Sequence, residues 1–339
     1  MSSKLNPVLI IGGSGVVGSW TARTIRTLHP DLPLAIGGRD LAKADAVARD
    51  IGGATGIKVD LDRPDLGLSG DQAFSAVAVF VKDDALSSMR YAQHHRVPYI
   101  SVSSGTFEIG PEVAQYIHAP DRAPILLASH WLAGAAIFPV LAFAKSFQRI
   151  DAIRIGVLLD EQDMGGPAAL ADYNRITGAA PASLTVKDGR MHWVSGDEAK
   201  ARYVSVDGVE LEAQAYSPFD IMALAARTDA KAIRLDLAYS QSASRRRGEP
   251  FSTEIAVEIE GQGADGKHRL DRHEIVHPQG QAPLTALGVA LAVERLLGLA
   301  GGNAPKAGLY LPEVLIDPAY YVGRMKEFGA SFENKGTVV

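Results

Sequence analysis

A run of glycines directly after the first apolar segment constrains the fold of this chain more than any other feature. The apolar segment Val8–Ile11 precedes it, and an amphipathic stretch that ends at Pro30 follows it. Between them lie, in order, Gly12, Gly13, Ser14, Gly15, Val16, Val17 and Gly18. Such a turn lets the backbone approach a pyrophosphate, whose charge meets the free N–H groups and the positive end of the helix dipole. We therefore interpret residues 12–18 as a dinucleotide-binding turn rather than a plain strand-to-helix connection.

The end of the second predicted strand indicates which dinucleotide binds. Leu34–Ile36 leads to Gly38, Arg39 and Asp40. NAD-binding proteins usually carry an acid at this strand tip for the ribose hydroxyls, whereas a guanidinium fork matches the oxygens of a 2′-phosphate. Because Arg39 stands at the tip and Lys43 lies one turn into the next helix, we expect NADP(H). In the alternative, Asp40 binds the ribose and Arg39 is a solvated side chain.

Strand and helix signals alternate through the first part of the chain, which predicts an α/β fold with a doubly wound parallel sheet. The further predicted strands there are 57–59, 76–81, 99–102 and 125–128, and the predicted helices are 41–51 and about 83–95. Ligands of such sheets bind at the carboxyl ends of the strands. The residues that we expect there to contact the cofactor are Asp60, Phe80, Val81, Ser103 and Ser104. Asp60 has a second interpretation as a turn or cap residue.

The middle of the chain predicts a second, α+β domain with a mostly antiparallel sheet. Its clearest predicted strands are 153–159, 232–239, 251–260 and 268–277, and a long apolar helix follows at 284–299. We predict three regions: a dinucleotide-binding domain at 1–130, a second α+β domain at 131–280, and a helical C-terminal region at 281–339.

Composition excludes several classes of protein. The chain has 34 Lys and Arg against 39 Asp and Glu, a formal charge of −5, which argues against nucleic acid as a partner. It has no cysteine, which excludes disulfides, thiolate metal sites and a Cys nucleophile. No secretory signal opens the sequence, so we expect a cytoplasmic protein. The charge-free run 123–143 contains His130 and Pro139, which predicts a buried strand and a buried helix rather than a membrane span.

Two motifs have alternative interpretations, and a third is missing. His273–His277 matches the zinc-binding His-Glu-x-x-His, but in a strand residues four apart lie roughly 13 Å apart, so we predict no metal site. The run 245–247 consists of three arginines and is interpreted as a solvated turn or, alternatively, an anion clamp. No tyrosine has a lysine four residues later, so the Tyr-x-x-x-Lys pair of short-chain dehydrogenases is absent from the sequence.

The layout resembles the saccharopine dehydrogenase-like oxidoreductases, a superfamily that includes saccharopine reductase and carboxynorspermidine dehydrogenase. The resemblance rests on residues 8–48, 220–234 and 284–313, including Gly38-Arg39-Asp40-Leu41-Ala42-Lys43-Ala44 and Gly308-Leu309-Tyr310-Leu311-Pro312-Glu313. It implies a Rossmann domain at 1–130, an inserted substrate and dimerisation domain at 131–280, and C-terminal helices at 281–339 that return to the first domain. It also implies hydride transfer between NADP(H) and an imine of an amino-acid-like substrate, and a homodimer formed through the second domain. The sequence departs from the family at 99–101 and 128–134, which leaves the small-molecule substrate open.

Candidate catalytic and substrate-binding residues lie near the expected meeting point of nicotinamide and substrate. His130 has an ordinary pKa that suits a proton donor, and Lys82 can bind a carboxylate or donate a proton. Tyr173 is a third candidate catalytic residue. The candidate substrate-binding residues are Trp131, Arg175 and Arg227. The competing interpretations are a packing histidine, a surface lysine and a core tryptophan.

We therefore expect an NADP(H)-dependent oxidoreductase that acts on a C–N bond in a cleft between two domains. Reduction of a carbonyl or an activated alkene is the alternative reaction. A non-catalytic NADP(H) sensor is the alternative of a different class, since the sequence shows no compelling acid–base constellation.

Overall fold

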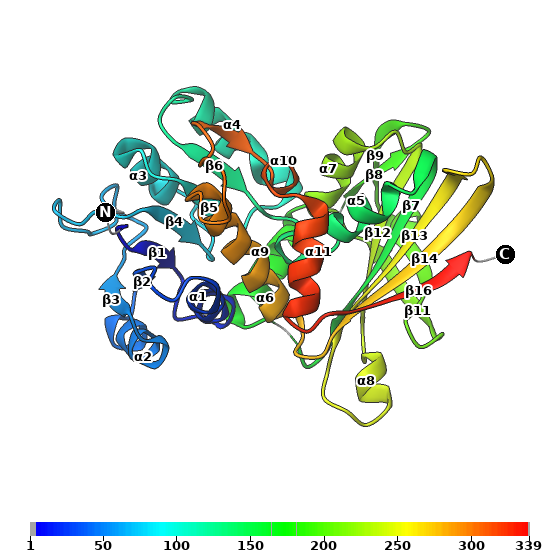
Figure 1. Cartoon of the computed structure of the whole chain (residues 1–339), viewed down its shortest axis with the longest axis horizontal. Coiled ribbons are helices and arrows are strands. Elements are labelled where there is room, and N and C mark those ends of the chain that lie inside the picture. Colours follow the sequence, from blue (N-terminus) through cyan, green and yellow to red (C-terminus); the bar gives the residue numbers. More distant parts are fainter. Residues whose placement is uncertain (1–4, 164, 181, 338–339) are drawn as a thin grey trace. The chain divides into compact units, whose positions relative to one another are not determined.

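The computed structural model describes residues 5–163, 165–180 and 182–337 (Figure 1). The chain divides into two compact units, which are described separately. Unit 1 consists of Met1–Ser129 and Thr285–Ile316, and unit 2 of His130–Leu284 and Asp317–Val339. The predicted return of the whole stretch 281–339 to the first domain is wrong for its last part. Residues from Asp317 onward belong to unit 2, because the C-terminal strand satisfies its backbone hydrogen bonds in the sheet of that unit.

Unit 1 is built on a parallel seven-stranded sheet of order β15-β6-β5-β4-β1-β2-β3 (Figure 1). Its strands are β1 (Val8–Ile11), β2 (Leu34–Gly38), β3 (Ala54–Lys58), β4 (Ala76–Val79), β5 (Tyr99–Ser101), β6 (Pro124–Leu127) and β15 (Gly308–Tyr310). This confirms the predicted α/β class and doubly wound sheet. The strand order reverses between β1 and β4, which is the switch point where ligands of such sheets bind.

The apolar runs of the sequence become the buried strands of unit 1. Every residue of β1, β4 and β6 is buried, as expected for strands covered on both faces. The helices of this unit are α1 (Val16–Leu28), α2 (Leu41–Ile51), α3 (Ser87–His95), α4 (Ile109–Ile117), the 3₁₀ helix η1 (Thr106–Glu108), α10 (Pro312–Leu315) and, from Thr285 onward, α9 (Gln281–Leu296). Helix α1 buries one face, which includes Gly18, Ala22 and Ile25.

Unit 2 is built on a mixed sheet of order β10-β11-β12-β7-β13-β14-β16, with the β8–β9 hairpin attached to β12. Its strands are β7 (Phe147–Asp160), β8 (Ser183–Lys187), β9 (Arg190–Val194), β10 (Lys200–Val204), β11 (Glu210–Ala215), β12 (Ala232–Ser240), β13 (Thr253–Gly263), β14 (His268–His277) and β16 (Ser331–Thr337). The β7–β12 pair is parallel and the other pairs are antiparallel, which confirms the predicted mostly antiparallel sheet.

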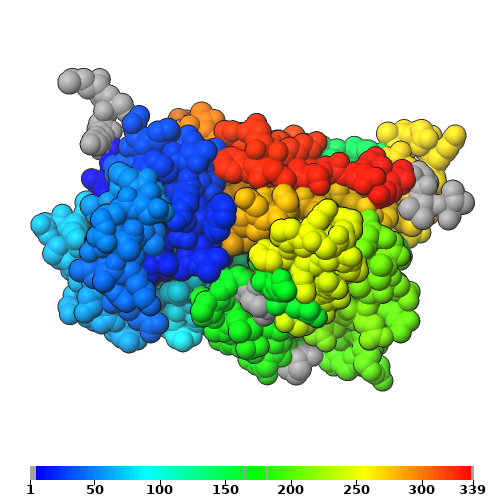
Figure 2. All heavy atoms as spheres, turned by 90° about the horizontal axis from the view of Figure 1, so that it is seen from below, coloured from blue at the N-terminus to red at the C-terminus, as the bar shows by residue number. Residues whose placement is uncertain are grey.

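Helices of unit 2 pack on the sheet or lie at its surface. They are η2 (Trp131–Gly134), α5 (Ile137–Ala144), α6 (Pro167–Ala179), η3 (Gly196–Ala199), α7 (Asp220–Arg227), α8 (Ala243–Arg246) and α11 (Pro318–Glu327). Helix α5 contacts α7, α11 and the central strands β7 and β13. Helix α6 has no buried residue and is visible on the face in Figure 2, together with α8 (yellow) and β16 (red).

The charge-free run 123–143 forms the buried strand β6 and most of the buried helix α5, as predicted. Among the described residues, no helix has both the length and the apolar character that crossing a membrane requires.

Candidate dinucleotide-binding and catalytic site

The glycine turn of unit 1 connects β1 to α1 in a conformation that only small residues allow. Gly12 has a φ of +84°, in the region that favours glycine. A Cβ at Gly13 would lie 2.7 Å from the carbonyl oxygen of Ile10, and a Cβ at Gly18 would lie 2.7 Å from the Cα of Gly13. These are backbone atoms that no rotamer change can move. The glycines therefore bring the first turn of α1 directly against the end of β1.

The N-terminus of α1 presents the backbone N–H groups of its first turn, which have no acceptor within the helix. Its N-cap residue is Gly15, which has no side chain to accept a hydrogen bond, and the first turn carries no acidic residue. Gly15 and Val16 are exposed, while Ser14 and Val17 are half-buried. This combination of close glycine packing, exposed backbone and positive helix dipole fits the pyrophosphate of a dinucleotide. The structure thus brings together the predicted residues 12–18.

The tip of β2 lies beside this turn, because a Cβ at Gly38 would be 3.4 Å from the Ser14 hydroxyl. Arg39 is exposed and makes no hydrogen bond or ion pair with any residue that the structure describes. The Asp40 carboxylate caps α2, accepting a hydrogen bond from the backbone N–H of Lys43 at 3.2 Å. The Lys43 ammonium is exposed and lies 3.9 Å from the same carboxylate. Of the two side chains at the tip, Arg39 is the one left to bind a ligand.

Two further predicted cofactor residues contact the glycine turn, and one has a local role. A Cβ at Gly12 would lie 3.2 Å from a methyl group of Val81 and 3.3 Å from the Cβ of Phe80. Phe80 also donates its backbone N–H to the carbonyl of Ile11 at 3.0 Å. The Asp60 carboxylate accepts from the backbone N–H of Asp62 at 3.1 Å, which is the turn role that the sequence left open.

The residues after β5 form a buried polar cluster around Glu112, which the sequence analysis missed. The Glu112 carboxylate oxygen Oε1 accepts from the hydroxyls of Ser104 at 2.8 Å and Ser101 at 3.2 Å. The backbone N–H of Ser104 donates to the Ser129 hydroxyl at 3.0 Å, and Ser103 is buried beside it. Burial raises the pKa of Glu112. An acid in the first turn of a helix is ordinary in sequence, so no local signal marked it.

Lys82 follows β4 and is held by an ion pair. Its ammonium lies 3.3 Å from a carboxylate oxygen of Glu108, and its side chain is 23% exposed. The other oxygen of Glu108 accepts the backbone N–H of Gly105 at 2.7 Å. Lys82 therefore has a fixed position and keeps some access to solvent.

In unit 2, His130 is buried and its pKa differs from the expected one. Burial lowers the pKa of His130 to about 3, so its imidazole is neutral at pH 7. The expectation that its ordinary pKa suits an imidazolium proton donor is therefore wrong for this structure. The ring lies 6.0 Å from that of Phe219, edge to face.

Three aromatic side chains of unit 2, those of Trp131, Tyr173 and Tyr216, lie next to one another. Trp131 lies edge to face with Tyr216 at 6.0 Å, and Tyr173 of α6 lies 6.3 Å from the same ring. Burial raises the pKa of Tyr216, with Tyr173 as the next largest cause. The structure therefore groups His130, Trp131 and Tyr173 around residues that the sequence analysis missed, namely Tyr216 and Phe219.

The two candidate arginines of unit 2 differ in their surroundings. Arg175, on α6, forms an ion pair with Asp172 at 2.9 Å, and its charge also influences Tyr216. Arg227 is exposed in the last turn of α7, about 10 Å along the helix from Asp220 at the other end. Asp220 lies beside Trp131, so the structure places Arg175 near the aromatic group and Arg227 away from it.

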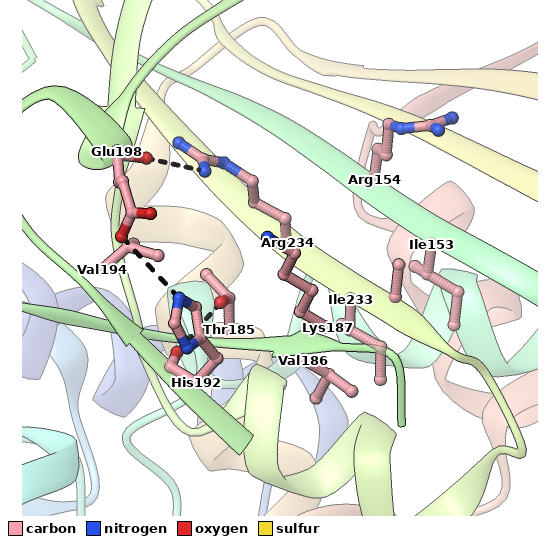
Figure 3. Close-up of a pocket in the computed structure, with 11 residues that line it drawn as sticks. Ile153, Arg154, Thr185, Val186, Lys187, His192, Val194, Glu198, Ile233 and Arg234 are labelled. Carbon is pink, nitrogen blue, oxygen red and sulfur yellow. Dashed lines mark hydrogen bonds and ion pairs between the residues drawn. The ribbon is translucent and has the colours of Figure 1, made fainter. Parts of the chain in front are cut away.

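Unit 2 also holds a cavity of about 330 Å³ that contains none of the predicted site residues (Figure 3). Its apolar lining includes Ile153, Val186 and Ile233. At its rim, the Arg234 guanidinium donates to the carbonyl of Glu198 at 3.0 Å, and His192 lies 3.7 Å from the Glu198 carboxylate. Two of its polar lining residues, Arg234 and His192, are therefore engaged by Glu198 rather than directed at a ligand.

The two histidines of the His-Glu-x-x-His motif have structural roles. His273 and His277 lie on β14, as predicted, where His273 stacks on Phe143 at 3.8 Å and His277 binds the carbonyl of Phe328 at 3.0 Å. Within the described part of the chain, no group of three or more His, Asp or Glu residues could hold a metal.

Each arginine of the run 245–247 pairs with an acid of unit 2. Arg245 binds Asp160 at 2.8 Å, and Arg247 binds Glu249 at 2.8 Å. Arg246 binds Asp207 at 2.6 Å. These pairs leave the run poorly suited to clamp an external anion, because every guanidinium already has a carboxylate partner.

Comparisons with known proteins agree with this fold. No protein-family model and no curated protein matches the sequence. The structure is similar to apo saccharopine dehydrogenase (L-Glu forming) from Saccharomyces cerevisiae, with a TM-score of 0.68 and 13% identity over 97% of this chain and 99% of that one. This similarity confirms that the chain has the fold of saccharopine dehydrogenase.

Weaker similarities, which add nothing to the argument, extend to two other enzymes. One is an oxidoreductase from Agrobacterium radiobacter in complex with NAD+, with a TM-score of 0.47 and 14% identity over 90% of this chain and 92% of that one. The other is dihydrodipicolinate reductase from Paenisporosarcina sp. TG-14, with a TM-score of 0.46 and 12% identity over 91% and 97% of the two chains.

Proposed function

We propose that this chain is an NADP(H)-dependent oxidoreductase that reduces an imine, or oxidises the corresponding amine, of a small amino-acid-like substrate. The observation that carries the proposal is the tip of β2. There Arg39 is exposed and has no partner among the described residues, beside the glycine turn, while Asp40 is engaged as a helix cap. The fold, which is that of saccharopine dehydrogenase, supports the C–N assignment.

The residues of unit 1 fit a dinucleotide cofactor. The glycine turn of residues 12–18 would hold the pyrophosphate, and Arg39 with Lys43 would bind a 2′-phosphate. Phe80 and Val81, which contact the turn, would border the cofactor at the switch point of the sheet. When bound, the nicotinamide supplies or accepts the hydride.

The reduction of an imine also needs one proton at the nitrogen. Lys82 is a cation fixed by Glu108, and it is suited to donate that proton or to bind a substrate carboxylate. His130 is neutral, so its role is to donate or accept a hydrogen bond rather than to act as an imidazolium acid. Of the two candidate arginines of unit 2, Arg175 is the one near the aromatic group, and a substrate carboxylate there would compete with Asp172 for its guanidinium.

A titration with NADPH and NADH tests the cofactor assignment. We expect Arg39→Ala to cost about 1–3 kcal/mol for NADPH, or roughly 5- to 150-fold in affinity, and to leave NADH binding little changed. Arg190→Ala, which removes an exposed arginine of β9 in unit 2, is the matched control and should affect neither cofactor. Equal losses for NADPH and NADH in Arg39→Ala would contradict the assignment.

An absorbance screen for NADPH oxidation tests the reaction. Pairs of amino acids and keto acids come first, then cyclic imines, then simple ketones. Oxidation with the first two classes supports action on a C–N bond, and oxidation with ketones alone supports carbonyl reduction.

A second candidate function is NADP(H) binding without turnover. It is favoured by the neutral state of His130 and by the ion pair of Lys82 with Glu108, because a neutral imidazole and a paired ammonium are weaker proton donors than the free cations. Tight NADPH binding with no oxidation in any class would select it. Homodimerisation through the second domain and a cytoplasmic location stay predictions, and light scattering of the purified chain tests the first.

A further inference from the structure

The turn that carries His130 and Trp131 has an unusual backbone. Leu132 and Ala133 have φ values of 48° and 53°, in the left-handed region that side chains disfavour. They are the only adjacent pair of non-glycine residues with positive φ in the described part of the chain. Gly134 follows with a φ of 120°, and a Cβ there would lie 2.7 Å from the ring of Phe138. Such a backbone persists only where its surroundings enforce it.

Two side chains from distant helices enforce this conformation. The Asp220 carboxylate, at the start of α7, accepts the backbone N–H of Trp131 at 2.6 Å. The Tyr321 hydroxyl, from α11, donates to the carbonyl of Ala133 at 3.2 Å. Both residues are fully buried in unit 2. Tyr321 is itself fixed by stacking on Phe138, with ring centroids 4.0 Å apart.

The start of α7 contacts both residues that the turn presents. Phe219 lies edge to face with the His130 ring at 6.0 Å, and the adjacent Asp220 binds the backbone of Trp131. A buried carboxylate on a backbone amide costs desolvation that an ordinary strand-to-helix connection does not require. The arrangement therefore indicates that the protein requires His130 and Trp131 to be held in one fixed orientation.

We propose that Asp220 and Tyr321 are positioning residues: they hold the turn 131–134, with its left-handed Leu132 and Ala133, and so fix His130 and Trp131 for the reaction. This inference rests on the proposed function. Asp220 and Tyr321 would then affect the rate of turnover only by holding this turn, without contacting substrate or cofactor.

Trp131 itself reports the state of the turn. In a W20F/W193F background it is the only tryptophan, and its burial predicts a blue-shifted emission that acrylamide quenches poorly. D220A should shift the emission to the red and raise the quenching constant at least about twofold as the turn relaxes. D220N should lie between wild type and D220A, because its amide oxygen can still accept the Trp131 N–H. Y321F should change the emission in the same direction as D220A.

E254A is the matched control. Glu254 is a buried carboxylate of the same unit that accepts a backbone N–H, from Ala243, at 2.6 Å. It should lower the melting temperature and leave the Trp131 emission unchanged. Unchanged emission and quenching in both D220A and Y321F would overturn the proposal. Should D220A fail to fold, D220N and Y321F still decide it.

Kinetics with a substrate from the absorbance screen separate positioning from plain stabilisation. We expect D220A to lower kcat by roughly 100-fold, as small misplacements of site residues do, with the KM for NADPH unchanged and partial recovery in D220N. A kcat in D220A equal to that of E254A would overturn the positioning role. If wild type binds NADPH but turns over no substrate class, the proposed function fails and the role in turnover fails with it, while the fluorescence still decides whether the two residues hold the turn.

Discussion

Two helical glycines of this chain predict opposite effects for the same substitution. Gly18 lies in the first turn of α1, where a Cβ would be 2.7 Å from the backbone of Gly13. Gly323 lies inside α11, where a Cβ would meet nothing within 4 Å. Replacing either glycine by alanine reduces the conformational freedom of the unfolded chain. Only Gly18→Ala forces backbone against backbone, so the pair isolates the cost of that close approach.

The magnitudes follow from these distances. Gly323→Ala should stabilise the protein by about 0.5–1 kcal/mol, the usual gain of alanine over glycine in a helix. Gly18→Ala has the same stabilising gain of at most about 1 kcal/mol. It also adds an overpacking cost, which we place near the upper end of the usual range at about 3 kcal/mol, because the backbone atoms that the new Cβ would meet cannot change rotamer. The net effect is a destabilisation of about 2 kcal/mol, and the two variants should differ by about 3 kcal/mol.

Denaturant unfolding and NADPH titration measure the two consequences. We expect Gly18→Ala to unfold at lower urea concentration than wild type and to bind NADPH at least about tenfold more weakly, because α1 must move away from the end of β1. Gly323→Ala should unfold at higher urea concentration and bind NADPH as wild type does. A Gly18→Ala protein that is stabilised like Gly323→Ala, or that keeps its NADPH affinity, would refute the close-packing argument.

Two other variants test electrostatics and capping. Burial raises the pKa of Asp163 to about 6. Above the ordinary carboxyl pKa the unfolded chain loses this proton while the folded protein keeps it, so the free energy of unfolding decreases as the pH rises. Between pH 4 and 6.5 the stability of wild type should fall by up to about 3 kcal/mol relative to Asp163→Asn. Thermal unfolding of both proteins across this range measures the difference, and parallel curves would contradict the shift. Asp40→Ala should cost about 1 kcal/mol through the loss of the α2 cap. The affinity of Asp40→Ala for NADH, measured by fluorescence, should equal that of wild type. A loss of NADH affinity in this variant would identify Asp40 as a ribose ligand.

Local chemistry made much of the candidate cofactor site predictable. The glycine turn, Arg39 and Lys43 are contiguous with the strands and helices that position them, so a strand signal, a turn and a helix signal were enough to place them. Phe80, Val81 and Ser104 were predictable for a related reason. Parallel strands end at one edge of the sheet, so residues that follow the strands meet there.

Residues that act through burial or distant partners were not predictable. Glu112 looks like an ordinary helix residue until the fold buries it against Ser101 and Ser104. Asp220 is 89 residues from the Trp131 N–H that it accepts. No sequence pattern links positions so far apart, because the contact depends on how α7 packs.

The amino-acid sequence by itself determined the alternation of strands and helices, the parallel sheet and the place of the glycine turn. These follow from hydrophobic periodicity and from the conformational freedom of glycine, which are properties of neighbouring residues. Only the tertiary structure decided the charge of His130, the left-handed backbone of Leu132 and Ala133, and the assignment of residues from Asp317 onward to unit 2. Desolvation, backbone strain and strand pairing depend on segments far apart in the chain, so their energies exist only once the chain is folded.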